Sequence, residues 1–304
     1  MTSVLGVALA LLATTVLGTY GWALFVALPY CLGLFAALFH GRRVPRTARE
    51  CQSVGLLAAV LASLGLVAVA AEGAICLVMA LPLTGPLAAL GGYTGYRIQR
   101  GGRGPRAATP ALYGIAVALP LLMGIEHAAD RRPAVAPVTT TIVVDAPPEV
   151  VWRHVVAFSR LPEKREAVFR TGIAYPVEAR IEGRGVGAVR RCRFSTGDFV
   201  EPITVWDAPR RLAFSVTAQP PPMREVSPWG AIHPPHLDGF LRSRRGEFRL
   251  TRLPGGRTRL TGTTWYENRM WPAAYWRELS DALIHRIHRR VLRHVKTLSE
   301  DARA

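Results

Sequence analysis

The stretch Ile142-Val-Val-Asp-Ala-Pro-Pro-Glu-Val-Val-Trp152 joins a strand to a helix. From Thr139 to Asp145, Ile142 and Val144 alternate with Thr141 and Val143, which is the pattern of a half-buried strand. Asp145 and Ala146 then stand near a helix cap, and two prolines fit the first turn, where helix N–H groups need no partner within the helix. The following residues supply a buried helix face: Val150, Val151, Trp152, Val155 and Val156. A soluble α+β domain therefore begins with a strand followed by a helix.

Downstream of this helix the sequence predicts more strands and one long helix. The strand segments are 177–181, 188–194, 199–206, 212–217, 246–253 and 257–266, and turn residues such as Pro254-Gly-Gly256 separate them. The helix extends from about Pro272 to Leu298, with an apolar stripe at steps of three and four. Its opposite face is basic. That face is either a solvated surface or a contact with membrane headgroups.

Three segments carry a resemblance to a known superfamily: residues 142–152, residues 201–216 and the hairpin 253–260. Residues 138–298 resemble the START-like (SRPBCC) superfamily, the polyketide cyclase/dehydrase and lipid-transport group. The resemblance implies a helix-grip fold, an antiparallel sheet wrapped around a long C-terminal helix. It also implies a deep, mostly apolar cavity, which different members use to bind lipids, sterols, polyketides or hormones, and some use for catalysis.

The first 129 residues differ sharply in composition, since they are almost uncharged outside two short loops. Five apolar segments predict a transmembrane region of about five helices: 3–17, 22–39, 53–71, 74–96 and 107–125. A signal peptide is the competing interpretation of the first segment, but no basic region precedes it and the apolar run continues too far. We therefore expect a multi-span α-helical membrane region at 1–129, a linker at 130–137 and a START-like domain at 138–304.

The positions of the basic residues predict how the chain crosses the membrane. All eight arginines of the first 129 residues lie in two loops: Arg42, Arg43, Arg46, Arg49, Arg97, Arg100, Arg103 and Arg106. Short loops rich in Lys and Arg stay in the cytoplasm, so five spans place the N-terminus in the cytoplasm and the C-terminal domain outside it. A fifth segment that does not span, with Arg131 and Arg132 beyond it, would return the domain to the cytoplasm.

Charge and cysteine content limit the partners. The net charge is +17, of which the membrane half contributes +5 and the remainder +12. Beside a bilayer, such a basic domain favours anionic lipid headgroups over nucleic acid, since each nearby basic residue contributes roughly 1 kcal/mol there. The cysteines at 31, 51, 76 and 192 form no pairing pattern. We expect no disulfide scaffold, no cysteine-based zinc site and no cofactor.

Candidate ligand-binding residues fall in three groups. Aromatic residues on the expected inner faces exceed what a thin sheet needs, although they also fit an ordinary core. The segment 220–245 is expected to cap the cavity as a lid, and a polar cluster at the end of the last strand either suits a ligand headgroup or caps the helix. The candidates are Phe194, Phe199, Phe214, Trp229, His233, His236, Trp265, Glu267, Asn268, Arg269 and Tyr275.

Catalysis and metal binding receive less support. His236, Asp238 and Glu267 are the candidate acid–base residues. His233, His236 and Asp238 offer metal-ligand atoms, but two prolines separate the histidines and three or four converging ligands are needed. We therefore expect no metal site. The first hypothesis is membrane-anchored binding of a hydrophobic small molecule or lipid, and the alternatives are a cyclase- or hydrolase-type enzyme or a ligand sensor coupled to the spans.

Overall fold

A computed structural model describes residues 2–101, 105–129, 133–163 and 166–302. The chain divides into two compact units. The helical unit comprises Met1–Arg132, Glu225–His236 and Arg269–Tyr275, and the sheet unit comprises Pro133–Arg224, Leu237–Asn268 and Trp276–Ala304. Arg103 and residues 130–132, including Arg131 and Arg132, lie outside the described residues.

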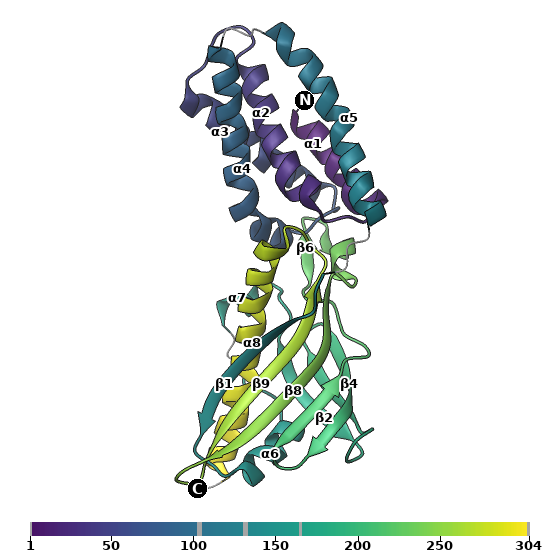
Figure 1. Ribbon diagram of the computed structural model, residues 1–304, viewed down its shortest axis with the longest axis vertical. Coiled ribbons are helices and arrows are strands. Elements are labelled where there is room, and N and C mark those ends of the chain that lie inside the picture. Colours follow the sequence, from purple (N-terminus) through teal and green to yellow (C-terminus); the bar gives the residue numbers. More distant parts are fainter. Residues whose placement is uncertain (1, 102–104, 130–132, 164–165, 303–304) are drawn as a thin grey trace. The chain divides into compact units, whose positions relative to one another are not determined.

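The helical unit contains most of the helices of the chain (Figure 1). Its helices are α1 (Thr2–Leu11), η1 (Leu12–Val16), η2 (Ala23–Ala27), α2 (Leu28–His40), α3 (Ala48–Ala68), α4 (Ala74–Arg100) and α5 (Pro105–Ala129). The predicted break at residues 18–21 separates η1 from η2, where Gly18 has a φ of +59°. A capping box begins α3, because Thr47 and Glu50 each accept a hydrogen bond from the other's backbone N–H.

Glycines allow α2 and α4 to approach closely. A Cβ atom on Gly33 would lie 1.9 Å from the carbonyl oxygen of Ala88, and one on Gly91 would lie 2.0 Å from that of Tyr30. Small residues at such crossings bring helix backbones into direct contact, which is how helices gain packing energy where water does not drive their association.

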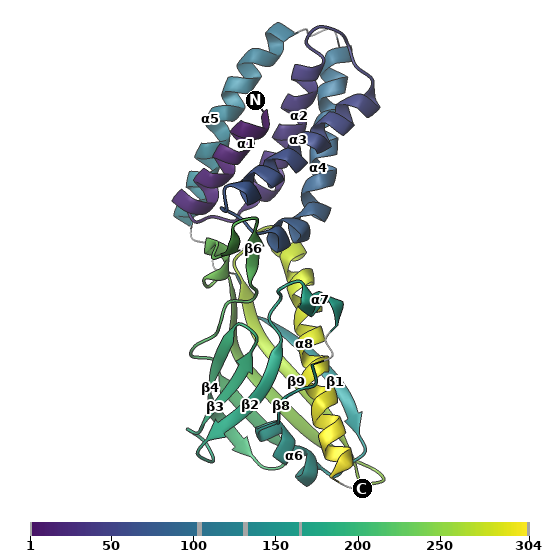
Figure 2. The ribbon, with the colours of Figure 1, turned by 180° about the vertical axis from the view of Figure 1, so that it is seen from behind.

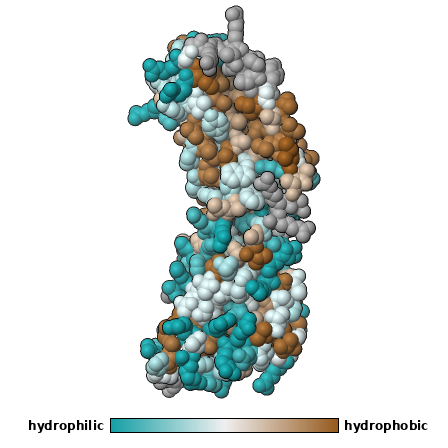
Figure 3. All heavy atoms as spheres, viewed as in Figure 1, coloured by the Kyte–Doolittle hydropathy of each residue, from teal (hydrophilic) through white to brown (hydrophobic). Residues whose placement is uncertain are grey.

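Among the residues that the structure describes, three helices of this unit are long and apolar enough to cross a membrane: Ala23–His40, Ala48–Ala68 and Ala74–Arg100. Their mean hydropathies over an 18-residue window are 1.9, 2.0 and 1.9. Large apolar side chains also face outward on this unit, among them Leu57, Leu64 and Val78, which are 55%, 58% and 68% exposed. Figure 3 shows hydrophobic residues gathered on the visible face of the helical unit.

The sheet unit is built on one antiparallel seven-stranded sheet of order β1-β9-β8-β5-β4-β3-β2. Its strands are β1 (Ala136–Val144), β2 (Pro176–Glu182), β3 (Val189–Phe194), β4 (Gly197–Asp207), β5 (Arg211–Ser215), β8 (Leu241–Leu253) and β9 (Arg257–Asn268). Register shifts between Ile203 and Val205 and between Ser243 and Arg245 mark bulges. Bulges bend a strand and increase its twist, which suits the curl of this sheet.

Helix α8 (Ala273–Asp301) lies along one face of the sheet, as the two ribbon views show (Figures 1 and 2). Val291, Leu292 and Val295 of α8 enter the core together with Leu212 of β5 and Leu260 of β9. The short helices α6 (Pro148–Val156) and α7 (Ala167–Arg170) complete the unit. A curled antiparallel sheet with a C-terminal helix confirms the predicted helix-grip architecture.

Candidate functional site

The sheet unit encloses a cavity of about 120 Å³ between its sheet and α8. Aromatic rings form much of its wall: Phe194 and Phe199 have ring centroids 4.6 Å apart, and Phe214 and Phe248 lie 6.2 Å apart. Ile284, Ile287 and Val291 approach from α8. An apolar cavity of roughly 150 Å³ in another protein holds a benzene molecule. The cavity therefore has room for about one ring or for part of a longer apolar chain.

One buried ion pair interrupts the apolar lining. Arg190 and Glu201 face each other directly in the β3–β4 register, so their side chains lie on the same face of the sheet. The guanidinium donates to the Glu201 carboxylate and, through Nε, to the carbonyl of Val156 at 3.2 Å. The two side chains are only 2% and 7% exposed. Burial raises the pKa of Glu201, while the charge of Arg190 opposes that rise.

Aromatic rings surround the cationic end of this pair. The Arg190 guanidinium carbon lies 5.4 to 5.7 Å from the ring centroids of Phe158, Phe214 and Phe248. A cation near an aromatic face is stabilised by the ring quadrupole, and more so when water is excluded. The ion pair can therefore persist inside an otherwise apolar wall and offer a ligand one fixed polar contact.

A histidine on α8 forms the second polar feature of the cavity. His288 lines it and contacts two strands, with Nε2 2.8 Å from the Thr264 hydroxyl and Nδ1 3.1 Å from the Thr140 hydroxyl. His285 approaches the same Thr140 hydroxyl at 2.8 Å. Burial, and then the neighbouring His285, lower the pKa of His288 to about 4. His288 is therefore neutral near pH 7 and fixes α8 to β1 and β9.

We expect this neutral histidine to make the protein less stable in acid. Its pKa is lower when folded than its ordinary value of 6.5, so the unfolded chain binds more protons between about pH 6.5 and 4. The stability contributed by neutral His288 is complete above that window and is lost as pH falls through it. Melting temperatures of full-length protein measured from pH 7.5 to 4 should fall less steeply for His288→Asn than for wild type or for the exposed control His233→Asn. Equal slopes would contradict this assignment.

The predicted ligand-binding residues separate into distinct groups. Phe194, Phe199 and Phe214 line the cavity together. Trp265, Glu267 and Asn268 lie on β9 but outside the cavity lining. Arg245 covers the Trp265 ring at 4.1 Å, Arg244 pairs with Glu267 at 2.6 Å, and Asn268 donates to Ser280 at 3.0 Å. These three therefore contribute to holding β9 against β8 and α8.

The other predicted residues are divided between the units. Trp229, His233, His236, Arg269 and Tyr275 belong to the helical unit, whereas Asp238 belongs to the sheet unit. Within the helical unit, the indole of Trp229 donates to the carbonyl of Ala68 at 2.6 Å, and the Tyr275 hydroxyl donates to that of Met79. The segment expected to act as a lid thus contributes β6 (Glu225–Ser227), β7 (Gly230–Ile232) and part of η3 (Pro235–Leu237) to the helical unit.

A buried carboxylate attaches that segment to α4. Glu225 is fully buried and accepts hydrogen bonds from the backbone N–H groups of Ile75 at 3.1 Å and Cys76 at 2.7 Å. These donors lie in the first turn of α4, where N–H groups lack partners within the helix and the helix dipole favours a negative charge. Glu225 therefore serves as a cap supplied from about 150 residues downstream in the chain.

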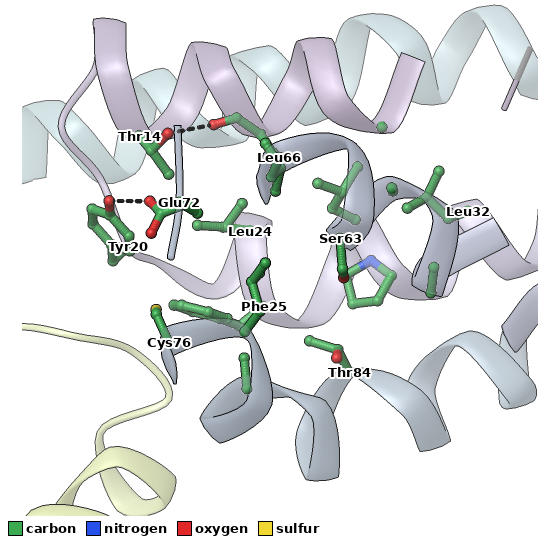
Figure 4. Close-up of a pocket in the computed structure, with 18 residues that line it drawn as sticks. Thr14, Tyr20, Leu24, Phe25, Leu32, Ser63, Leu66, Glu72, Cys76 and Thr84 are labelled. Carbon is green, nitrogen blue, oxygen red and sulfur yellow. Dashed lines mark hydrogen bonds between the residues drawn. The ribbon is translucent and has the colours of Figure 1, made fainter. Parts of the chain in front are cut away.

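Around this cap the helical unit gathers further polar groups. His236 Nδ1 lies 3.1 Å from Glu72 Oε2 and its Nε2 lies 3.6 Å from Glu225 Oε1. Tyr20 donates to Glu72 Oε1, which Figure 4 shows as the two side chains pointing at each other. Burial lowers the pKa of His236, but Glu225 and Glu72 outweigh it and raise the pKa to about 9.

The same polar groups border a small pocket in the helical unit. Its volume is about 80 Å³, and residues of α1, η1, η2, α2, α3 and α4 line it. Most of the lining is apolar, while Thr14, Tyr20, Glu72 and Cys76 place polar atoms at one end (Figure 4). The helical unit thus has an internal space of its own.

Sequence reasoning missed Arg190, Glu201 and His288 in one unit and Glu72, Cys76 and Glu225 in the other. Two signals were present: charged residues at paired positions of neighbouring strands, and an isolated Glu72 in an almost uncharged stretch. Neither signal identifies a partner, because the pairing depends on strand register and on contacts more than 100 residues apart in the chain.

Comparison with known protein families gives a match over most of the sheet unit. A family model described as polyketide cyclase / dehydrase and lipid transport matches residues 136–300. Similar solved structures include the ZhuI aromatase/cyclase of Streptomyces sp. R1128, with 18% identity and a TM-score of 0.39 over 56% of this chain and 97% of that one. Another is a norcoclaurine synthase variant of Thalictrum flavum, with 10% identity and a TM-score of 0.38 over 58% and 100%. The comparison with curated proteins finds no match.

Proposed function

Because this chain belongs to the polyketide cyclase / dehydrase and lipid transport family through residues 136–300, we propose that its sheet unit binds a hydrophobic small molecule or lipid. The cavity between the sheet and α8 carries the proposal. Its wall is aromatic and aliphatic, and the Arg190–Glu201 pair and His288 supply few, fixed polar contacts. Ligand sites of this kind are mostly apolar, with a small number of polar groups that orient the ligand.

We also propose that the helical unit anchors the protein in a membrane. The support is the outward-facing apolar surface of helices long enough to span, since soluble proteins rarely expose large contiguous apolar patches. A hydrophobic ligand partitions into the same membrane, which explains why an anchor and an apolar cavity occur in one chain. The net charge of +12 beyond residue 129 favours contact with anionic headgroups.

The distribution of arginines supports one orientation. The ends of α2 and α4 lie together, because the Gln99 side chain donates to Ala37 O at 2.9 Å and accepts from Arg46 N at 3.2 Å. Both arginine-rich ends are therefore on one side, which we assign to the cytoplasm, with five spans placing the C-terminal domain on the other. The test is to introduce a cysteine at position 200 and to label it with a reagent that does not cross the membrane. Labelling from the cytoplasmic side only would refute this orientation.

Filling the cavity should prevent binding. Gly262 of β9 lines the cavity, and a Cβ there would meet Phe248 and Leu292 at ordinary distances of 3.5 and 3.6 Å. The Cβ of Gly262→Val therefore fits without a clash, and its two methyl groups take up space at the cavity wall. In membranes exposed to a photoactivatable hydrophobic probe, we expect wild type to be labelled on β3, β5 and α8, and Gly262→Val to lose most of that labelling.

The matched control is Thr261→Val. Thr261 is the adjacent residue of β9 and points to the opposite face of the sheet, where its hydroxyl contacts Thr141. The photolabelling of the Thr261→Val protein should equal that of wild type. Labelling of β3, β5 and α8 that persists in Gly262→Val would contradict binding in this cavity, whereas labelling of the apolar helices should be the same in all three proteins.

A second candidate is a cyclase- or hydrolase-type reaction on a membrane-partitioned substrate. The observation that favours it is the buried carboxyl of Glu201 at the wall of an apolar cavity, since burial raises its pKa and a titratable group at that wall can reach a bound substrate. The two candidates differ in the molecule recovered from the protein. If the same compound is recovered from wild type and from Arg190→Met/Glu201→Leu, the protein only binds it. If a precursor of that compound accumulates on the double variant alone, the protein catalyses its conversion.

A further inference from the structure

The polar cluster of the helical unit has the donor set of a transition-metal site. Glu72, Cys76 and His236 are all buried, and one potential ligand atom from each lies within 4.8 Å of the others. A carboxylate oxygen, a thiolate sulfur and an imidazole nitrogen are the three ligand types that proteins offer to zinc. Neither hydrophobic ligand binding nor membrane anchoring requires such a combination.

The atoms that face one another lack hydrogen-bond partners among the described residues. Glu72 Oε2 and both ring nitrogens of His236 are buried without a hydrogen bond of acceptable geometry, although Glu72 Oε2 and His236 Nδ1 are 3.1 Å apart. In a tetrahedral site with bonds of about 2.0–2.3 Å, neighbouring ligand atoms lie about 3.3–3.8 Å apart. The observed 3.1 Å is slightly shorter than this range and corresponds to an angle of roughly 100° at the ion, which a distorted tetrahedral site accepts.

Outer groups already orient these ligands. Tyr20 donates to Glu72 Oε1 and so leaves Oε2 available. On the far side of the imidazole, Glu225 Oε1 lies 3.6 Å from Nε2, just beyond hydrogen-bond distance, so a small shift of either side chain would let it accept the proton of the ring nitrogen that does not bind metal. Metal-bound histidines nearly always have such a carboxylate or carbonyl partner, which fixes the tautomer. Glu225 is itself held by two backbone N–H groups of α4.

We propose that Glu72 Oε2, Cys76 Sγ and a ring nitrogen of His236 bind a Zn²⁺ ion, with Glu225 and Tyr20 as orienting partners. Three protein ligands leave one tetrahedral position for water. Because Glu72 and Cys76 also line the small pocket of Figure 4, that position lies next to an apolar space. The ion also links residues 225–236 to the start of α4, since its ligands come from both segments.

Metal content of the full-length protein tests this site. Protein without a polyhistidine tag is incubated with Zn²⁺ in detergent, desalted and analysed by inductively coupled plasma mass spectrometry. We expect about one zinc per chain in wild type, and loss of that zinc in Cys76→Ser and His236→Asn. Controls are Cys31→Ser, a buried cysteine of α2, and His233→Asn, an exposed histidine of the same segment; both should retain zinc.

Three measurements on folded protein guard against variants that do not fold. Replacing Zn²⁺ with Co²⁺ should give wild type a thiolate-to-cobalt charge-transfer band that Cys76→Ser lacks, and Glu225→Gln should weaken zinc affinity about 10- to 100-fold. Zinc should also raise the melting temperature of wild type, because an ion that binds only the folded state stabilises it. Wild type that retains no zinc, or Cys76→Ser with the same cobalt band, would overturn the proposal.

Discussion

Replacing Arg190 by methionine is expected to lower the free energy of unfolding by about 3–5 kcal/mol, because the change leaves Glu201 buried with an uncompensated charge. Both side chains are almost fully buried, and three aromatic rings surround the guanidinium, so water cannot replace the lost partner. The measurement is the melting temperature of full-length protein in detergent. We expect a fall of several degrees or loss of the folded species.

The matched variant removes both charges at once. Arg190→Met/Glu201→Leu fills a similar volume with apolar atoms, and replacing both members of a buried ion pair in this way is often neutral or stabilising. We therefore expect a melting temperature near that of wild type. A double variant as unstable as Arg190→Met would show that the two residues stabilise the sheet unit independently rather than as a pair.

Gly91→Ala should destabilise the helical unit by about 3 kcal/mol, at the upper end of what overpacking costs. The new methyl group would lie 2.0 Å from the carbonyl oxygen of Tyr30 and 2.8 Å from the nitrogen of Leu34. Both are backbone atoms, so the clash can be relieved only by separating α2 from α4. The fraction of protein that stays monodisperse in size-exclusion chromatography after heating reports this change.

A Gly→Ala substitution at another helix position should instead increase the stability of the helical unit. A Cβ on Gly124 of α5 would meet nothing within 4 Å, so Gly124→Ala adds helix propensity without a clash. Alanine is favoured over glycine in a helix by about 1 kcal/mol. A Gly91→Ala protein as heat-resistant as Gly124→Ala would contradict the close α2–α4 crossing.

Local patterns were enough to predict the architecture of the sheet unit. Alternation in β1 and the three-to-four spacing in α8 reflect periods set by the backbone itself. The prolines at the start of α6 fit a first helical turn, because that turn needs no N–H donor. The order of these elements and the resemblance of residues 138–298 to the START-like superfamily led to the helix-grip fold, and the family match at residues 136–300 agrees. The aromatic residues Phe194, Phe199 and Phe214 followed from the same alternation, because it determines which strand residues face the helix.

The polar parts of both candidate sites depend on contacts that no local pattern encodes. Arg190 meets Glu201 only because β3 and β4 pair in one register, and a shift by one residue would place the two side chains on opposite faces. His236 meets Glu72 across more than 160 residues of chain, through a segment expected to cover the cavity of the other unit. The sequence shows that Glu72 is unusual in an apolar stretch, but it does not show what neutralises it.

The central claim is that the cavity of the sheet unit holds a hydrophobic molecule taken from the membrane. Native mass spectrometry of full-length protein released from membranes tests it most directly. We predict a bound mass that extracts into organic solvent in wild type and in Thr261→Val, and its absence in Gly262→Val. A wild-type protein whose mass equals that of the bare chain, or a Gly262→Val variant that retains the same bound molecule, would contradict the claim.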